Sequence, residues 1–324
     1  MELVQSFLLS VTRVKLSVYE QRIITRIVEH GQKALQGYSR AQLKHISNPF
    51  GNEKISVKIR YILTDGTKDY AKVVTACKAL MSRQFEFYDP NTKTYYTDTV
   101  IHNVLHKERS GEVEFMVSRI FFEVMFNFSL GYKNYDLETA LSLPTPFAVR
   151  MYVLLNNQDR PLTWSIERLK EMFGVSDRYN QTADFIKKVI EPSRKALLAA
   201  SVNNFTYTRI YDGQKVVKLQ FFPVKVDEKA RRLFPDMSKE QITQAVAIRM
   251  YLHDDLGFTQ KEVGANKSTI DAFAQVPDAI THLYTIAKRA VRKSANTKGY
   301  IISAMKSEVK EWNEAIKELK LRKG

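Results

Sequence analysis

Apolar positions in the first third of the chain follow a helical spacing, then a strand spacing, then short alternating runs. Residues 18–35 (VYEQRIITRIVEHGQKAL) repeat apolar side chains three to four positions apart, which predicts a helix. Residues 54–63 (KISVKIRYIL) alternate apolar and polar, which predicts a strand, and residues 64–85 predict a turn and a helix. Turn signals at Pro90–Asn91 and Ser110–Gly111 separate the short runs that follow, which predicts a small antiparallel meander.

The pattern restarts after Pro144, behind a predicted helix at RIFFEVMFNFSLG (119–131). PFAVRMYVLLNNQ (146–158) predicts a helix with one apolar side, and SIERLKEMFGV (165–175) predicts a short second helix. A turn then leads into YNQTADFIKKVIEPSRKALLAAS (179–201), a longer amphipathic helix with a proline in its middle.

Two alternating strands follow in residues 203–222, joined by Asp212–Gly213, which is among the strongest short-range hairpin signals. Helix, helix, turn, helix and two-stranded ribbon is the element order of a winged helix, and it occurs twice, less clearly in the amino-terminal part. After about Asp227 the pattern predicts three or four helices and no strand.

These patterns predict an α+β chain that is mostly helical, with two winged-helix domains in tandem and a helical carboxy-terminal region. We expect the first domain in residues 1–140, the second in residues 141–225, and a carboxy-terminal extension of unknown role in residues 226–324.

The net charge of the chain indicates the kind of partner that the protein binds. The 324 residues carry 50 lysines and arginines against 35 acidic residues, a formal net charge of +15. This surplus predicts a polyanionic partner, most commonly nucleic acid, although a basic housekeeping protein without such a partner stays an alternative.

The one cysteine, Cys77, excludes a disulfide framework and a thiolate zinc site, and its apolar flanks predict a buried thiol. The absence of a signal-peptide pattern and of a long apolar run predicts a cytoplasmic protein.

Motifs for bond-breaking chemistry are missing from the sequence. There is no G-x-x-x-x-G-K-[ST] phosphate loop and no His-hydrophobe-His pair of the kind a rolling-circle nickase uses. His102 and His106 fall in a predicted strand and are interpreted as structural or surface histidines, and the pair Asp254–Asp255 as a solvated helix end. We therefore expect no catalytic activity, no cofactor and no metal site.

The amphipathic helix at 179–201 has three possible interpretations. A membrane-surface helix would have a more uniformly basic face and an interfacial tryptophan. Amides at the start with lysines behind them suit a major-groove helix, since Asn and Gln pair with adenine edges while Lys and Arg hold phosphates or read guanine. A solvated surface helix explains this stretch alone equally well, but the preceding helix-turn and the following hairpin favour DNA reading.

The predicted DNA contacts fall in three groups. Those on the helix are Arg178, Asn180, Gln181, Asp184, Lys187, Lys188, Arg194 and Lys195, those on the wing are Arg209, Lys215 and Lys218, and those in the first copy are Lys68, Lys72 and Lys78. The first-copy lysines are better suited to backbone contact or packing than to base reading.

Four segments in order, LPTPFAVRMYVLL, SIERLKEMFGV, YNQTADFIKKVIEPSRKAL and FTYTRIYDGQKVVKLQFF, resemble the second winged helix of the iteron-binding, theta-type plasmid replication initiators. The amino-terminal part resembles the first winged helix of this family less specifically, and the resemblance spans about residues 1–225. The chain departs from the family at Leu197–Leu198–Ala199, where a Glu-Ile-Asn run is usual. The matching residues of the second winged helix are Ala148, Arg150, Tyr152, Leu154, Leu155, Leu169, Gly174, Val175, Tyr179, Asp184, Phe185, Lys187, Val189, Ile190, Pro192, Gly213, Val216 and Phe221.

The resemblance implies a protein that binds direct repeats in double-stranded origin DNA as a monomer, with the second winged helix reading the major groove. It further implies melting of AT-rich DNA, recruitment of the host initiator and replicative helicase, and dimers formed through the first winged helix that repress the gene. It also implies a bacterial cytoplasmic protein, encoded by a plasmid or mobile element, with no membrane partner. The alternative function is a transcriptional repressor of the same architecture with no role in initiation.

Overall fold

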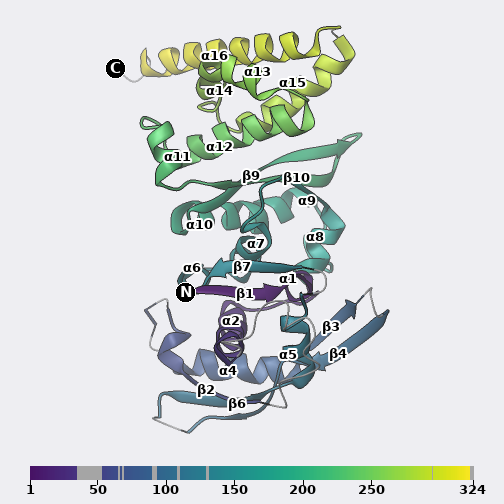
Figure 1. The fold of residues 1–324 in the computed structure, drawn as a ribbon, viewed down its shortest axis with the longest axis vertical. Helices are drawn as coiled ribbons and strands as arrows, with labels where there is room; N and C mark the ends of the chain where they lie inside the picture. The colour runs from purple at the N-terminus through teal and green to yellow at the C-terminus, as the bar shows by residue number, and fades with distance from the viewer. Residues whose placement is uncertain are drawn as a thin grey trace. The chain divides into compact units, whose positions relative to one another are not determined.

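Figure 1 shows the computed structural model of the chain, which describes residues 1–34, 53–64, 66–67, 69–89, 93–107, 110–128, 131–293 and 295–321. The chain divides into two compact units. The first joins Met1–Asn157 to Glu167–Ser201, and the second joins Gln158–Ile166 to Val202–Gly324.

The first unit combines helices with three small antiparallel sheets. In its amino-terminal part the elements are β1 (Glu2–Ser6), α1 (Phe7–Val11), α2 (Val18–Ala34), β2 (Glu53–Lys58), the 3₁₀ turn η1 (Ile59–Tyr61), α4 (Tyr70–Ser82), β3 (Gln84–Asp89), β4 (Thr94–Thr99), β5 (Ile101–Leu105), β6 (Glu112–Val117), α5 (Arg119–Phe126), β7 (Tyr132–Asp136) and α6 (Leu137–Ser142). It continues with α7 (Pro146–Leu155), α8 (Ile166–Met172), α9 (Thr182–Phe185), the π-helical segment η3 (Ile186–Ile190) and α10 (Glu191–Ala200).

The first predicted helix is confirmed as α2, and Ile23, Ile27 and Val28 on its apolar stripe are fully buried. Helix α4 packs against α2 and carries Cys77, which is also fully buried. Burial raises the pKa of the Cys77 thiol to about 12, because the thiolate loses its hydration. The prediction of a buried core thiol is therefore confirmed.

The strand predicted at 54–63 is shorter than expected. β2 ends at Lys58, and the chain then turns through η1. The alternation holds for Ile55, Val57 and Ile59, which are buried, but fails at Tyr61, which is exposed. A 3₁₀ turn repeats every three residues rather than every two, so the alternation stops where the turn begins.

The single meander predicted after α4 is wrong, because its strands divide between two sheets. β3 and β4 pair only with each other, while β5 pairs with β6 and β6 with β2. The division falls at Val100, a buried residue at a bend between β4 and β5. The turn predicted at Pro90–Asn91 lies outside the described residues, and at the other predicted turn Gly111 adopts a positive φ of 68°.

Strands β1 and β7 were not predicted. They pair antiparallel from Glu2 opposite Asp136 to Ser6 opposite Tyr132. Each strand has five residues, and its partner lies about 130 positions away in the sequence, so local periodicity gives little signal for either.

Helix α7 begins with Thr145 as its N-cap and Pro146 in its first turn, and the Thr145 hydroxyl accepts a hydrogen bond from the Ala148 amide at 3.1 Å. The helix is confirmed, but the prediction of one apolar side is too narrow. Every residue from position 148 to position 155 is buried, including Arg150. Such a helix is enclosed on all sides by its own unit.

The second unit is a three-stranded antiparallel sheet with helices after it. The elements are β8 (Leu162–Ser165), β9 (Asn203–Asp212), β10 (Lys215–Lys225), α11 (Glu228–Leu233), α12 (Lys239–Met250), the π-helical segment η4 (Tyr251–Asp255), α13 (Gln260–Ala265), α14 (Lys267–Phe273), α15 (Ala279–Lys293) and α16 (Thr297–Leu321). The strand order is β8-β10-β9.

The hairpin of β9 and β10 is confirmed, with Asp212 opposite Lys215 and Gly213 at a positive φ of 57° in the turn. β8 was not predicted. Its residue Ser165, expected to cap the following helix, lies opposite Lys218 of β10, and α8 begins one residue later.

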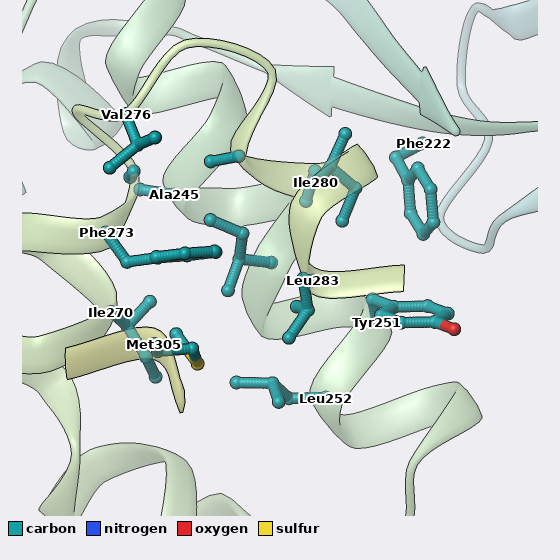
Figure 2. Close-up of a cluster of buried hydrophobic side chains, with 14 of the residues drawn as sticks. Phe222, Ala245, Tyr251, Leu252, Ile270, Phe273, Val276, Ile280, Leu283 and Met305 are labelled. Atoms are coloured by element: carbon teal, nitrogen blue, oxygen red, sulfur yellow. The ribbon is translucent and has the colours of Figure 1, made fainter. Parts of the chain in front are cut away.

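One face of this sheet is covered by the carboxy-terminal helices. Phe222 and Val224 of β10 share a buried cluster with Tyr251, Ile280 and Leu283, which η4 and α15 supply. Figure 2 shows Phe222 beside Tyr251 and Ile280 in this cluster, and the Phe222 and Tyr251 rings meet edge to face with centroids 5.8 Å apart. Residues 226–324 therefore share a hydrophobic core with the wing strands.

The carboxy-terminal region has six α-helices among its described residues, more than the three or four predicted. One reason for the larger number is a break between Phe273 and Ala279, where a turn that contains Pro277 separates α14 from α15. Within the described residues, no helix is both long and apolar enough to span a bilayer.

Candidate nucleic-acid interface

Helix α8 and the residues that follow it fix the turn before the amphipathic helix. Gly174 adopts a positive φ of 64° after α8, and the amide of Val175 donates to the carbonyl of Lys170 at 2.9 Å. Tyr179 also has a positive φ, 56°, and its carbonyl accepts a hydrogen bond from Lys170 Nζ at 2.8 Å. A non-glycine residue in this region needs support from its surroundings, and Lys170 gives that support.

The side chains that follow this turn surround an open hollow of about 550 Å³. It is lined by Asp177, Arg178, Tyr179, Asn180, Gln181, Asp184 and Lys188. Five of these, Arg178, Asn180, Gln181, Asp184 and Lys188, are residues that the sequence predicted to contact DNA. The structure therefore brings amides, cations and a carboxylate together at the start of the helix.

The amphipathic helix is continuous from Thr182 to Ala200, but one turn of it, η3, is π-helical. Pro192 lies two residues after this segment, and it has no N–H to donate to the carbonyl of Lys188 four residues earlier. A wider turn before the proline is one way to relieve the clash of its ring with that carbonyl. Pro192 therefore neither ends the helix nor interrupts its buried side.

Burial along this helix repeats every four residues. Phe185, Val189, Ser193 and Leu197 are all buried, whereas an α-helix of 3.6 residues per turn would drift by more than one position over that length. The π turn takes up the extra residue. Ala183, at the start of the helix, is exposed despite its apolar side chain.

The π turn shifts the helical phase, so Arg194 does not lie on the exposed side of the helix. The prediction that it does is wrong. Its side chain is only 13% exposed, and its Nε donates to the Glu191 carboxylate at 3.1 Å. Lys187 and Lys195 are exposed as predicted, and Lys188 is exposed with Asp184 3.7 Å from its ammonium. An exposed ion pair at that distance contributes little to stability, so Lys188 stays available to a phosphate.

The three predicted wing residues do not share one face of the sheet. Arg209 lies on the face of β9 that carries Tyr207, whereas Lys218, opposite Ile210, lies on the other face, and Lys215 follows the turn. Partial burial lowers the pKa of Arg209, but side-chain hydrogen bonds with Tyr207 and Tyr211 outweigh it and raise the pKa overall. Arg209 is therefore a charge held in place by two phenols, while Lys215 and Lys218 are exposed.

Of the first-copy lysines, Lys72 and Lys78 are exposed on α4, and Lys72 lies 3.6 Å from Asp69. Lys68 lies outside the described residues. The two described lysines are six positions apart on one helix, and no described amide accompanies them on α4.

His102 and His106 make local hydrogen bonds. Nδ1 of His106 hydrogen-bonds the carbonyl of Glu112 at 3.0 Å, and Nδ1 of His102 lies 3.1 Å from the hydroxyl of Thr99. Over the described ranges of the chain, no three His, Cys, Asp or Glu side chains are grouped as they would be around a metal ion. Asp255, one of the acidic pair, accepts a hydrogen bond from Gln220 of β10 at 3.0 Å.

Sequence reasoning missed the hydrogen bond between Lys170 and the backbone of Tyr179, which positions the turn. The positive φ of Tyr179 has no local signal, because tyrosine disfavours that conformation. Only the agreement of Tyr179 with the family pattern pointed to this residue.

Comparison with known families gives two matches in chain order. Residues 3–156 match the model described as "Initiator Replication protein, WH1", and residues 165–222 match "Initiator Rep protein, WH2". Among solved structures, the chain is similar to the crystal structure of the Pi initiator protein in complex with iteron DNA, with a TM-score of 0.52 and 14% sequence identity. That match covers 70% of this chain and 98% of the other, and at this identity it shows a shared fold. No curated protein matches the sequence. The two tandem winged helices and the helical carboxy-terminal region predicted from the sequence are thereby confirmed.

Proposed function

Since the chain belongs to the initiator Rep protein family, we propose that it binds double-stranded origin DNA sequence-specifically and initiates replication of a plasmid. The observation that supports this most is the hollow at the start of α9, where residues suited to base reading converge on a rigid helix. In this proposal the protein has no catalytic activity, acts in the bacterial cytoplasm, opens the origin, and recruits the host initiator and replicative helicase.

Each side chain at the hollow has a chemical role in this proposal. Asn180 and Gln181 offer the donor and acceptor pair that matches an adenine edge, and Arg178 offers the fork that matches guanine. Asp184 is an acceptor for the amino group of cytosine, and its charge is partly offset by Lys188. Lys187 and Lys195 face outward for phosphate contact.

The wing and the first winged helix make backbone contacts in this proposal. On the wing, phosphates are bound by Lys215, Lys218 and Arg209. On the first winged helix, Lys72 and Lys78 add contacts that carry no sequence information. In this proposal Arg194 does not contact DNA and acts only as a positioning group, because its guanidinium is paired with Glu191. Residues 1–140 also form the dimer that limits copy number.

Footprinting on the DNA that flanks the gene, combined with a plasmid-maintenance assay, tests the proposal. We expect protection of direct repeats spaced by one or two helical turns, about 10–22 bp, and maintenance of a plasmid that carries this DNA and gene. Tight binding to a lone palindrome without maintenance would show a transcriptional repressor instead. Absence of binding to the flanking DNA would overturn both functions.

Gln181→Ala is expected to reduce preference among DNA sites while leaving binding to unrelated duplexes unchanged. A bidentate amide contact provides about 1–3 kcal/mol of discrimination against the wrong base. Competition binding between the repeat and single-base variants measures this loss. Gln84→Ala, which removes an exposed amide on β3, is the matched control and should leave the preference intact. Unchanged specificity in Gln181→Ala would place base reading elsewhere.

Lys187→Ala is expected to weaken binding to every duplex by a similar factor and to flatten the slope of log K against log salt by about one unit. Lys187 is exposed and holds no described ion pair, so the change removes one phosphate contact without disturbing the fold. Titrations at four or more salt concentrations give the slope. Lys317→Ala on α16 is the control, and an equal slope in the two variants would contradict the assignment.

A further inference from the structure

The carboxy-terminal helices contain a long stretch without negative charge. Between Asp278 and Glu308 the sequence has six lysines and arginines and no acidic residue. This stretch forms α15 and the first turns of α16, which pack side by side. It lies beyond residue 222, where the match to the family models ends.

Helix α15 presents part of this charge on a rigid support. Its inner side, including Ile280, Leu283 and Ile286, is buried in the core that contains Phe222. Its outer side carries Lys288, Arg289 and Arg292, all exposed, which we call the α15 strip. Because the inner side is fixed by packing, the three cations are held at helical spacing on one surface.

Several exposed cations on other helices meet carboxylates. Lys33 lies 2.6 Å from Glu29, and Arg119 lies 3.0 Å from Glu123. In the described part of the chain, Arg289 and Arg292 have no ion-pair partner, and Lys288 lies over the ring of Tyr284, 4.8 Å from its centroid. A solvated helix face usually intersperses both signs of charge, so an unneutralised strip is typical of a surface that meets a polyanion.

The position of α15 within its unit connects the strip to the wing. α15 packs against β9 and against the sheet face that carries Phe222 and Val224. Alternation along β10 places Lys218 on this same face, nearer the turn of the hairpin. Lys218 and the α15 strip thus belong to one rigid unit and to one side of its sheet.

We propose that the carboxy-terminal extension makes an additional contact with the DNA backbone through Lys288, Arg289 and Arg292. This inference rests on the proposed DNA-binding function. The contact is to phosphates rather than bases, because α15 carries these cations but no Asn or Gln side chain, so it adds affinity without sequence preference.

Arg289→Ala/Arg292→Ala tests this proposal against the matched pair Lys310→Ala/Lys317→Ala, which removes the same charge from exposed positions of α16. The probe is a 60-bp duplex of mixed sequence, titrated with the full chain across salt concentrations. Loss of two phosphate contacts is expected to reduce the slope of log K against log salt by about 1.8 and the affinity at 0.15 M salt by roughly 30-fold. The α16 pair is expected to leave both unchanged.

Charge-preserving replacement separates a charge contact from a structural role. Arg289→Lys/Arg292→Lys is expected to restore the slope, since a point charge suffices for a phosphate, and circular dichroism should give the same melting curve for all variants. Equal slopes in the alanine pair, the α16 pair and the unsubstituted chain would overturn the inference and point to another partner, such as an acidic protein. Failure of the unsubstituted chain to bind any duplex would instead overturn the proposed function itself.

Discussion

Gly174→Ala is expected to destabilise the first unit by about 2–5 kcal/mol. Two costs add at this position. The positive φ of 64° is disfavoured for alanine by about 1–2 kcal/mol, and the new Cβ would overlap backbone atoms of Val14 and Lys15. Overlap with backbone cannot be relieved by a rotamer change, so it adds about 1–3 kcal/mol. Equilibrium unfolding in urea measures the loss.

Gly111→Ala is the matched control for this substitution. Gly111 has a similar φ of 68° and belongs to the same unit, but no atom lies within 4 Å of the Cβ position. We expect it to lose only the conformational cost, about 1–2 kcal/mol. Equal losses in the two variants would show that the close approach of residues 14–15 to Gly174 does not exist in solution.

Arg150→Met is expected to destabilise the same unit by about 3–5 kcal/mol. The buried guanidinium donates to the carbonyls of Ser10, Thr12 and Val14, the last at 2.9 Å. No described carboxylate accompanies it, and burial lowers its pKa to about 10, so it is still charged at neutral pH. Methionine fills a similar volume but leaves three buried acceptors without a donor, and charged hydrogen bonds are worth about 1.5–3 kcal/mol each.

Arg13→Met provides the comparison for this second substitution. Arg13 is 60% exposed and pairs with Glu171 at 2.9 Å, so its loss should cost less than 1 kcal/mol. Circular dichroism measures the unfolding of both variants, because both tryptophans, Trp164 and Trp312, belong to the second unit. A loss below 1 kcal/mol in Arg150→Met would mean that residues 10–14 find other donors and that Arg150 does not hold this segment to α7.

Both substitutions act on the segment between α1 and α2, which lies between Arg150 of α7 and Gly174 after α8. Because Lys170 of α8 also holds the carbonyl of Tyr179, this segment supports the turn that presents Asn180 and Gln181. A weakened segment is therefore expected to loosen the turn at residues 179–181 before the unit unfolds.

The sequence predicts those elements whose signals are local. α2 has a helical apolar stripe, and the hairpin of β9 and β10 has alternation with Asp212–Gly213 between the strands. β1, β7 and β8 are too short for a clear periodicity, and their partners lie far away in the sequence. Pairing of that kind depends on the whole fold rather than on neighbours.

The sequence also predicts the exposure of only some residues of the candidate site. Gln181 before the π turn and Lys187 near its start are exposed as a helical wheel predicts. Arg194, after it, is not, because a wheel of 100° per residue assumes an unbroken α-helix. The α15 strip was visible as AKRAVRK in the sequence, but the absence of ion pairs on it required the structure.

The shared core of the wing strands and the carboxy-terminal helices affects how the protein can be divided for experiments. A fragment that stops at Lys225 contains every residue that the family models match, yet it exposes the sheet face with Phe222 and Val224 to water. Exposed apolar faces of that kind cause aggregation. An expression fragment for DNA-binding work should therefore extend at least through α16, even though its last third lies outside both family-model matches.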